Sequence, residues 1–123
     1  MLHFSDYPAR VNTAMNRTLF IAQRLSALVL GPLVVVHLAL IIIAVRGGLT
    51  ADEILARTQG NIAWVIFYTI FVIAVSIHAP IGVRNVLREW STFSGRVIDA
   101  TIIVFALLLL ILGLRAVVAV TSF

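Results

Sequence analysis

The 123-residue sequence contains no cysteine, and charged residues make up only 11% of it. The absence of cysteine excludes disulfides, thiolate-ligated iron–sulfur clusters and covalent haem attachment through a C-x-x-C-H motif. A metal cofactor on this chain would therefore have to be held by histidine. Hydrophobic residues make up 62% of the sequence and the mean hydropathy is +1.13, a balance that soluble domains of this length do not approach.

Three long apolar stretches predict an all-α membrane protein with three transmembrane helices. The stretches run from Leu25 to Val45, from Ile62 to Val83 and from Ala100 to Leu114, and a further apolar segment follows Arg115. At about 1.5 Å per residue the first two can cross a hydrocarbon core of roughly 30 Å, and the third can cross if Arg115 snorkels to the far interface. We therefore expect a single transmembrane domain over residues 1–123, with a polar N-terminal segment at 1–17 and spans at about 18–46, 62–84 and 98–120.

All nine basic residues are arginine, and their distribution predicts the orientation in the membrane. Six precede the first span or lie in the second loop, and three lie in the first loop or near the C-terminus. The two groups are Arg10, Arg17, Arg24, Arg84, Arg88 and Arg96 on one side, and Arg46, Arg57 and Arg115 on the other. By the positive-inside rule the N-terminus is cytoplasmic, so we expect a multi-pass protein of the bacterial cytoplasmic (inner) membrane. The net charge of +4 follows from this pattern and does not indicate a nucleic-acid partner.

The connections between the spans are too short to form a soluble domain. In the first connection, Thr50 followed by Asp52 and Glu53 predicts the capped start of a short helix. The second, from about Arg84 to Asp99, is the densest polar region of the chain. We expect a soluble partner to dock there.

Two prolines lie inside the apolar stretches, Pro32 in the first and Pro80 in the second. Each removes a backbone donor and leaves one carbonyl without its helical partner. We therefore expect a kink at both positions.

His37 and His78 are the residues that indicate chemistry, because an ionisable side chain deep in an apolar span is costly and by default suggests function. The structural alternative is a neutral imidazole hydrogen-bonded to a carbonyl of a neighbouring helix. Among cofactors, b-type haem suits one intramembrane histidine per helix, whereas structural zinc would need three or four converging ligands.

The depths of the two histidines differ. His37 lies roughly 20 Å from the inner edge marked by Arg24, and His78 lies roughly 9 Å from the edge marked by Arg84. A separation of about 11 Å along the membrane normal is too large for both to hold one iron. If both are ligands they serve different haems, and each haem needs a second histidine from a partner subunit or from another copy of this chain.

The segment His78-Ala-Pro-Ile-Gly82-Val-Arg84-Asn85-Val-Leu-Arg-Glu89 resembles the H-x-x-x-G-[IV]-R-H-x-x-x-D segment of the large cytochrome b membrane anchor of succinate dehydrogenase and fumarate reductase. The resemblance implies that His78 is an axial ligand of haem b. It further implies that Gly82 lets the haem approach the helix and that Arg84, with Asn85 beside it, compensates a haem propionate.

The start of the first span carries a second resemblance to the same family. Gln23-Arg24-Leu25-Ser26-Ala27 is similar to the H-R-x-[ST]-G segment, which implies that Arg24 and Ser26 contribute to a quinone site. His37 resembles the first-helix ligand of the two-haem members, which implies a second, distal haem.

The sequence departs from the family pattern at five positions. The departures are Asn85 and Gln23 in place of histidines, Glu89 in place of aspartate, Ala27 in place of glycine, and Phe20 where the family often has a quinone-site serine.

The resemblance implies a membrane anchor and b-type cytochrome subunit of a respiratory succinate:quinone oxidoreductase. Its partners would be an iron–sulfur subunit, a flavoprotein subunit, membrane lipid, and either a second small anchor or another copy of itself. Its cofactors would be one or two haems b, with ubiquinone or menaquinone as substrate and no dicarboxylate chemistry on this chain. The alternatives are a haem-free anchor of the same kind of complex, and a small transporter or assembly factor that uses an intramembrane histidine.

Overall fold

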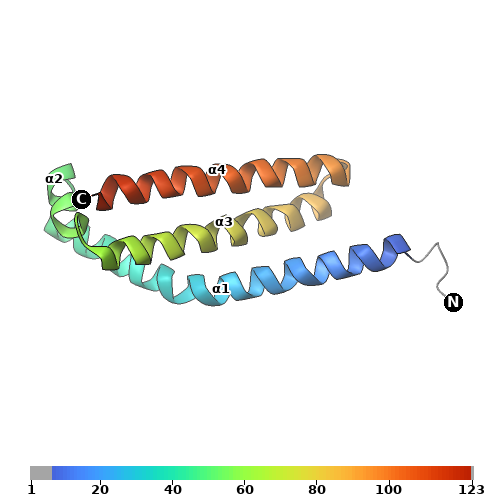
Figure 1. Cartoon of the computed structure of the whole chain (residues 1–123), viewed down its shortest axis with the longest axis horizontal. Helices are drawn as coiled ribbons and strands as arrows, with labels where there is room; N and C mark the ends of the chain where they lie inside the picture. Colours follow the sequence, from blue (N-terminus) through green and yellow to red (C-terminus); the bar gives the residue numbers. More distant parts are fainter. Residues whose placement is uncertain (1–6, 123) are drawn as a thin grey trace.

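The structure, a computed structural model, describes the backbone of residues 7–122 and the side chains of residues 16–122. Within that range the chain forms four helices and no strand (Figure 1). They are α1 (Tyr7–Gly47), α2 (Ala51–Thr58), α3 (Ile62–Trp90) and α4 (Gly95–Thr121). Three of them, α1, α3 and α4, are long and apolar enough to cross a membrane, which confirms the predicted all-α membrane fold with three spans.

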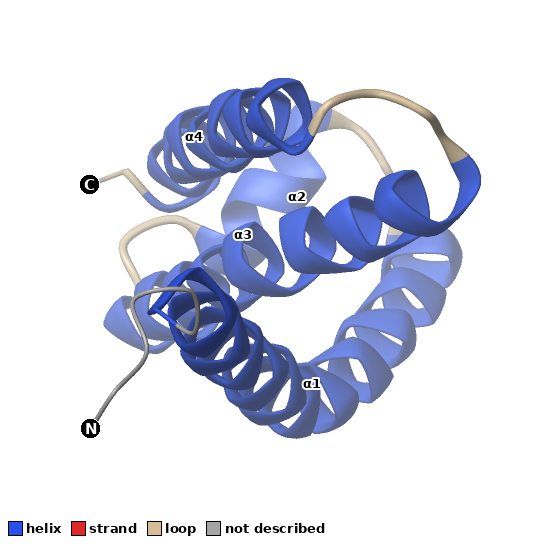
Figure 2. Cartoon of the chain, turned by 90° about the vertical axis from the view of Figure 1, so that its right-hand side faces the viewer, coloured by secondary structure: helices blue, strands red, loops and turns tan. Residues whose placement is uncertain are grey.

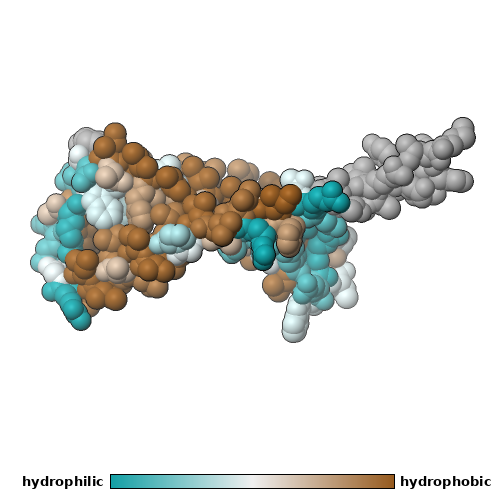
Figure 3. Space-filling view, turned by 90° about the horizontal axis from the view of Figure 1, so that it is seen from below, coloured by the Kyte–Doolittle hydropathy of each residue, from teal (hydrophilic) through white to brown (hydrophobic). Residues whose placement is uncertain are grey.

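α3 is the central helix and packs against both α1 and α4 (Figures 1 and 2). The buried hydrophobic residues are few: Leu30, Ala74, Ile81, Ile98, Ile102 and Val117. Most large apolar side chains are exposed, and they form a hydrophobic region between two hydrophilic ends (Figure 3). Because this surface could not remain stable in water, it must contact lipid or the helices of other subunits.

Two predictions about the helix boundaries need correction. α1 extends back to Tyr7, so most of the predicted polar N-terminal segment is helical and continuous with the first span; residues 1–6 lie outside the described range. The predicted loop from Arg84 to Asp99 is mostly helix, because α3 continues to Trp90 and α4 begins at Gly95. Polar residues in this segment therefore do not mark the ends of the helices, because the helices continue through them.

Pro32 lies inside α1 and Pro80 lies inside α3. Figure 2 shows that α1 changes direction along its length, as expected for a helix that contains an interior proline. This bend keeps α1 alongside α3 over part of its length only.

α2 fixes the connection between α1 and α3 to the end of α4. The predicted cap is confirmed: Thr50 and Glu53 form a reciprocal capping box, in which Thr50 Oγ1 accepts from the Glu53 N–H and the Glu53 carboxylate accepts from the Thr50 N–H at 2.9 Å. At the other end of α2, Thr58 Oγ1 donates to the carbonyl of Val120 at 2.5 Å. Side chains of this short connection therefore hold the end of α4 against α2.

Candidate functional site

His78 is held against α1 through one of its two ring nitrogens. Nδ1 lies 3.4 Å from the carbonyl oxygen of Gln23 and 3.4 Å from Oγ of Ser26. Ser26 is buried, and its hydroxyl donates to the same Gln23 carbonyl at 2.9 Å. No hydrogen bond within the described residues involves Nε2, so the second ring nitrogen keeps its capacity for a ligand.

An apolar groove of about 410 Å³ runs along α3 beside this histidine. Its lining residues are His78, Ala79, Gly82, Val83, Val86 and Leu87. Gly82 stands one turn after His78, and a Cβ added there would meet only the amide nitrogen of Gln23, at 3.5 Å. Gly82 therefore leaves this part of the groove wall without a side chain, although a Cβ would fit against α1. An imidazole with one ring nitrogen that makes no hydrogen bond within the described residues, beside an apolar groove, fits an axial ligand and its macrocycle.

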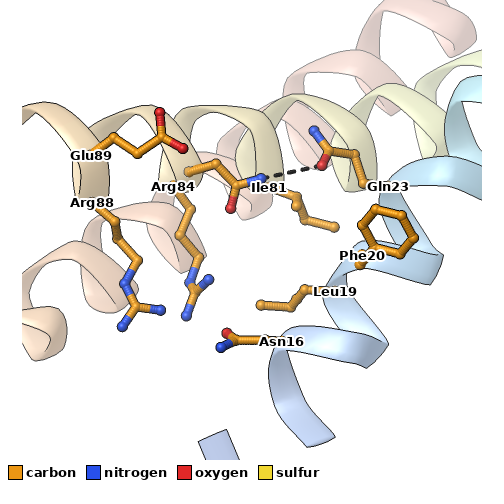
Figure 4. A pocket seen from close by; sticks show the side chains of 9 residues that line it. Asn16, Leu19, Phe20, Gln23, Ile81, Arg84, Arg88 and Glu89 are labelled. Carbon is orange, nitrogen blue, oxygen red and sulfur yellow. Dashed lines mark hydrogen bonds between the residues drawn. The ribbon is translucent and has the colours of Figure 1, made fainter. Parts of the chain in front are cut away.

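A polar cavity of about 290 Å³ lies between α1 and the C-terminal part of α3 (Figure 4). It is lined by Asn16, Leu19, Phe20, Gln23, Ile81, Arg84, Asn85, Arg88 and Glu89. Asn85 Nδ2 donates to Gln23 Oε1 at 3.2 Å across the two helices. Amide and guanidinium donors therefore stand beside apolar side chains, an arrangement that can bind an anion or a neutral carbonyl oxygen.

Arg84 is only 7% exposed, and its guanidinium binds on the α4 side of α3. Nε donates to Asp99 Oδ1 at 3.0 Å, while the end of the guanidinium lies next to that of Arg88 in the polar cavity (Figure 4). The structure thus brings His78 and Gly82 together in the groove and places Arg84 in the other cavity. Asp99, at the end of the polar second connection, is the partner that holds this buried charge.

The two residues predicted to contact quinone do not share a site. Ser26 is directed at Gln23 and His78, whereas Arg24 is exposed, with its guanidinium 5.6 Å from the centre of the Phe20 ring. Phe20 itself lines the polar cavity. The sequence alone did not predict that these residues form one polar cavity. Its only signal was that Gln23 and Asn85 depart from the family pattern.

His37 lies at a different level of the bundle and in different surroundings. Its ring centroid is 6.2 Å from that of Tyr68 and 5.2 Å from that of Phe71. Its Nδ1 is buried and has no hydrogen-bond partner within the described part of the chain. Tyr68 and Phe71 precede His78 along α3 by roughly 10–15 Å, which agrees with the separation expected from the sequence and keeps the two histidines at separate sites.

Together these features define a class of protein: a three-span membrane subunit with an intramembrane histidine tied between two helices and a polar cavity at one end. Over residues 8–114 the chain matches the family described as succinate dehydrogenase/fumarate reductase transmembrane subunit. The chain belongs to this family, and it is accordingly a membrane anchor that associates with the other subunits of such a complex. No curated protein and no solved structure matches the chain.

Proposed function

We propose that this chain is the cytochrome b anchor of its complex and that Nε2 of His78 ligates haem b. The observation that carries the proposal is that the His78 ring has two different environments. Its Nδ1 faces two oxygens of α1, while the ring and Gly82 line an apolar groove. A metal-bound histidine usually has its second nitrogen fixed in this way by a backbone or side-chain acceptor. When bound, the haem supplies one-electron transfer between the iron–sulfur subunit and membrane quinone.

The polar cavity is the better candidate for the quinone head group than the predicted pair Arg24 and Ser26. Gln23, Asn85 and Arg88 offer donors for a quinone carbonyl oxygen, and Leu19 and Phe20 offer an apolar wall for its ring. Gln23 also connects the two sites, because its carbonyl faces His78 and its side-chain amide faces the cavity. The guanidinium groups of Arg84 and Arg88 make the cavity a suitable place to compensate the charge of haem propionates.

Spectroscopy of the purified complex tests the haem assignment. His78→Ala should remove the b-type band of the haem that His78 binds from the reduced-minus-oxidised spectrum, while the iron–sulfur and flavoprotein subunits still co-purify. His37→Ala is the matched control, since it removes another intramembrane imidazole and should leave the His78-dependent band in place. An unchanged spectrum in His78→Ala refutes the proposal, and a pyridine haemochrome assay without haem in the native complex supports the haem-free anchor.

A second, distal haem on His37 is a separate candidate, favoured by the buried Nδ1 without a partner and by the aromatic rings around it. It predicts two haems per complex and two midpoint potentials in a redox titration. His37→Ala would then remove one of the two. A single haem that survives His37→Ala leaves His37 as a residue that only packs between the helices.

Quinone kinetics separate the two versions of the quinone site. With the cavity as the site, Asn85→Ala raises the KM for a soluble quinone several-fold, and Arg24→Ala leaves it within about twofold of the native value. A raised KM in Arg24→Ala with an unchanged KM in Asn85→Ala would instead support a quinone site at Arg24.

A further inference from the structure

The hydrogens around His78 can be assigned from the chemistry of its neighbours. Ser26 has a single hydroxyl hydrogen, and it is donated to the Gln23 carbonyl at 2.9 Å. Toward His78, at 3.4 Å, the hydroxyl oxygen can therefore only accept, and a carbonyl oxygen always accepts. Both oxygens near Nδ1 can accept a hydrogen bond from it, and the imidazole is the group that can supply the hydrogen.

The opposite tautomer would place a lone pair on Nδ1 against the lone pairs of the Gln23 carbonyl. That contact lies among apolar helices, where a polar atom without a partner is costly. A neutral imidazole at this position therefore carries its hydrogen on Nδ1 and its lone pair on Nε2, the nitrogen left for the groove.

We infer that Ser26 is a positioning residue for His78: it fixes the tautomer and the ring orientation that present Nε2 to a bound iron. This inference deepens the proposed haem site, on which its redox part rests, and it gives Ser26 a role different from the quinone contact predicted from the sequence. Ser26 is only 6% exposed, which agrees with a role inside the helix pair.

The hydroxyl matters because each Nδ1 contact is long, so neither acceptor alone holds the ring firmly. An acceptor on Nδ1 also increases the basicity of the ligating nitrogen, which favours the oxidised iron. Removing the hydroxyl should therefore loosen the ring, weaken haem retention and move the midpoint potential to a more positive value.

The test compares Ser26→Ala with Ser26→Thr, which keeps the hydroxyl, in the purified complex. Ser76→Ala is the matched control, because Ser76 makes the same kind of backbone contact, to the Val72 carbonyl at 2.7 Å, without touching His78. We expect Ser26→Ala to lose haem about 10-fold more readily, with a more positive potential and an altered low-spin EPR signal. Ser26→Thr and Ser76→Ala should behave like the native complex.

A haem-independent measurement keeps the inference falsifiable if Ser26→Ala assembles poorly. In the full chain in detergent micelles without haem, ¹⁵N NMR of the histidine ring should show Nδ1 protonated in the native protein. In Ser26→Ala the population should shift toward Nε2 protonation. Loss of the b-type band in His78→Ala, together with an unchanged potential and an unchanged tautomer in Ser26→Ala, overturns this inference and leaves the haem assignment intact. A reduced-minus-oxidised spectrum that is unchanged in His78→Ala overturns the haem assignment, and the NMR result then decides the tautomer by itself.

Discussion

Gln23 and Asn85 stand where the family pattern has two histidines, and in this chain they are hydrogen-bonded to each other across α1 and α3. The two departures therefore contact each other in this chain, where they form one amide pair across the two helices. Amides do not titrate, so the contact keeps its hydrogen bond at any pH at which the complex works. An imidazole pair would couple the same contact to proton uptake.

This pairing predicts non-additive substitutions. Gln23→Ala and Asn85→Ala should each lower the free energy of unfolding in detergent micelles by about 1 kcal/mol, because each removes the same hydrogen bond. The double variant should cost less than the sum by at least about 0.5 kcal/mol. Asn16→Ala, in the wall of the same cavity, is the control for simple truncation, and strictly additive losses would show that the two amides are independent.

Which residues meet around α3 could be predicted only in part. Helical geometry places Gly82 and Asn85 close to His78 around the helix and Arg84 on another side. In the structure Gly82 lines the groove with His78, whereas Asn85 lines the polar cavity together with Arg84. The partner of Arg84 could not be predicted, because α3 is apolar on nearly every face and its sequence does not show which face meets α4 and which meets lipid. Asp99 becomes a partner because α3 and α4 face each other across the short connection from Ser91 to Ser94.

Among the helices, the start of α2 could be predicted from the sequence because the residues of its capping box, Thr50 and Glu53, lie within four consecutive positions. Its capping box also responds to pH. Two hydrogen bonds to its carboxylate lower the pKa of Glu53 below 4.5. The larger effect comes from the backbone N–H of Thr50 and the smaller from the Thr50 hydroxyl. A lowered pKa means that the ionised carboxylate stabilises the first turn of α2 above about pH 4.5, and that this contribution is lost as the pH falls through the lowered value.

We therefore expect ¹³C shifts of residues 51–54 to lose helical character between pH 6 and pH 3 in the native chain. Glu53→Gln keeps an acceptor oxygen but does not titrate, so its shifts should stay constant over that range. An equal loss in both proteins would assign the change to another group.

The contact between α3 and α4 depends on the small size of Gly113. A Cβ added there would lie 2.5 Å from Cγ1 of Val72, closer than two carbon atoms can approach, and Val72 is β-branched with few alternative rotamers in a helix. Gly113→Ala should therefore destabilise the chain in micelles by about 1–3 kcal/mol through overpacking. Gly31→Ala is the matched control, since an added Cβ there meets nothing within 4 Å, and equal losses in the two variants would show that the effect is not steric.

At the scale of the whole molecule, the spans bury few of their own side chains, and the chain is a membrane subunit whose surface is completed by lipid and by partner helices. Composition was enough to predict this class, because a hydrocarbon solvent demands long apolar helices whatever their partners. The same composition hides the partner-facing surfaces, since lipid and a neighbouring apolar helix select the same residues.

The arginine distribution predicts the orientation of the chain in the membrane. This prediction can be tested at both ends of the molecule, because each end carries a connection between helices. The connection from α3 to α4 lies at the end of the molecule where α1 begins, and the connection from α1 to α2 lies at the opposite end (Figure 1). Because the chain has no cysteine, Thr92→Cys and Leu49→Cys each introduce a single thiol, and both positions are exposed. With a cytoplasmic N-terminus, a membrane-impermeant maleimide should label Leu49→Cys in cells whose inner membrane is intact and should label Thr92→Cys only after that membrane is permeabilised. Both variants should react in detergent, which controls for thiols covered by a partner, and the reverse labelling in intact cells would invert the topology.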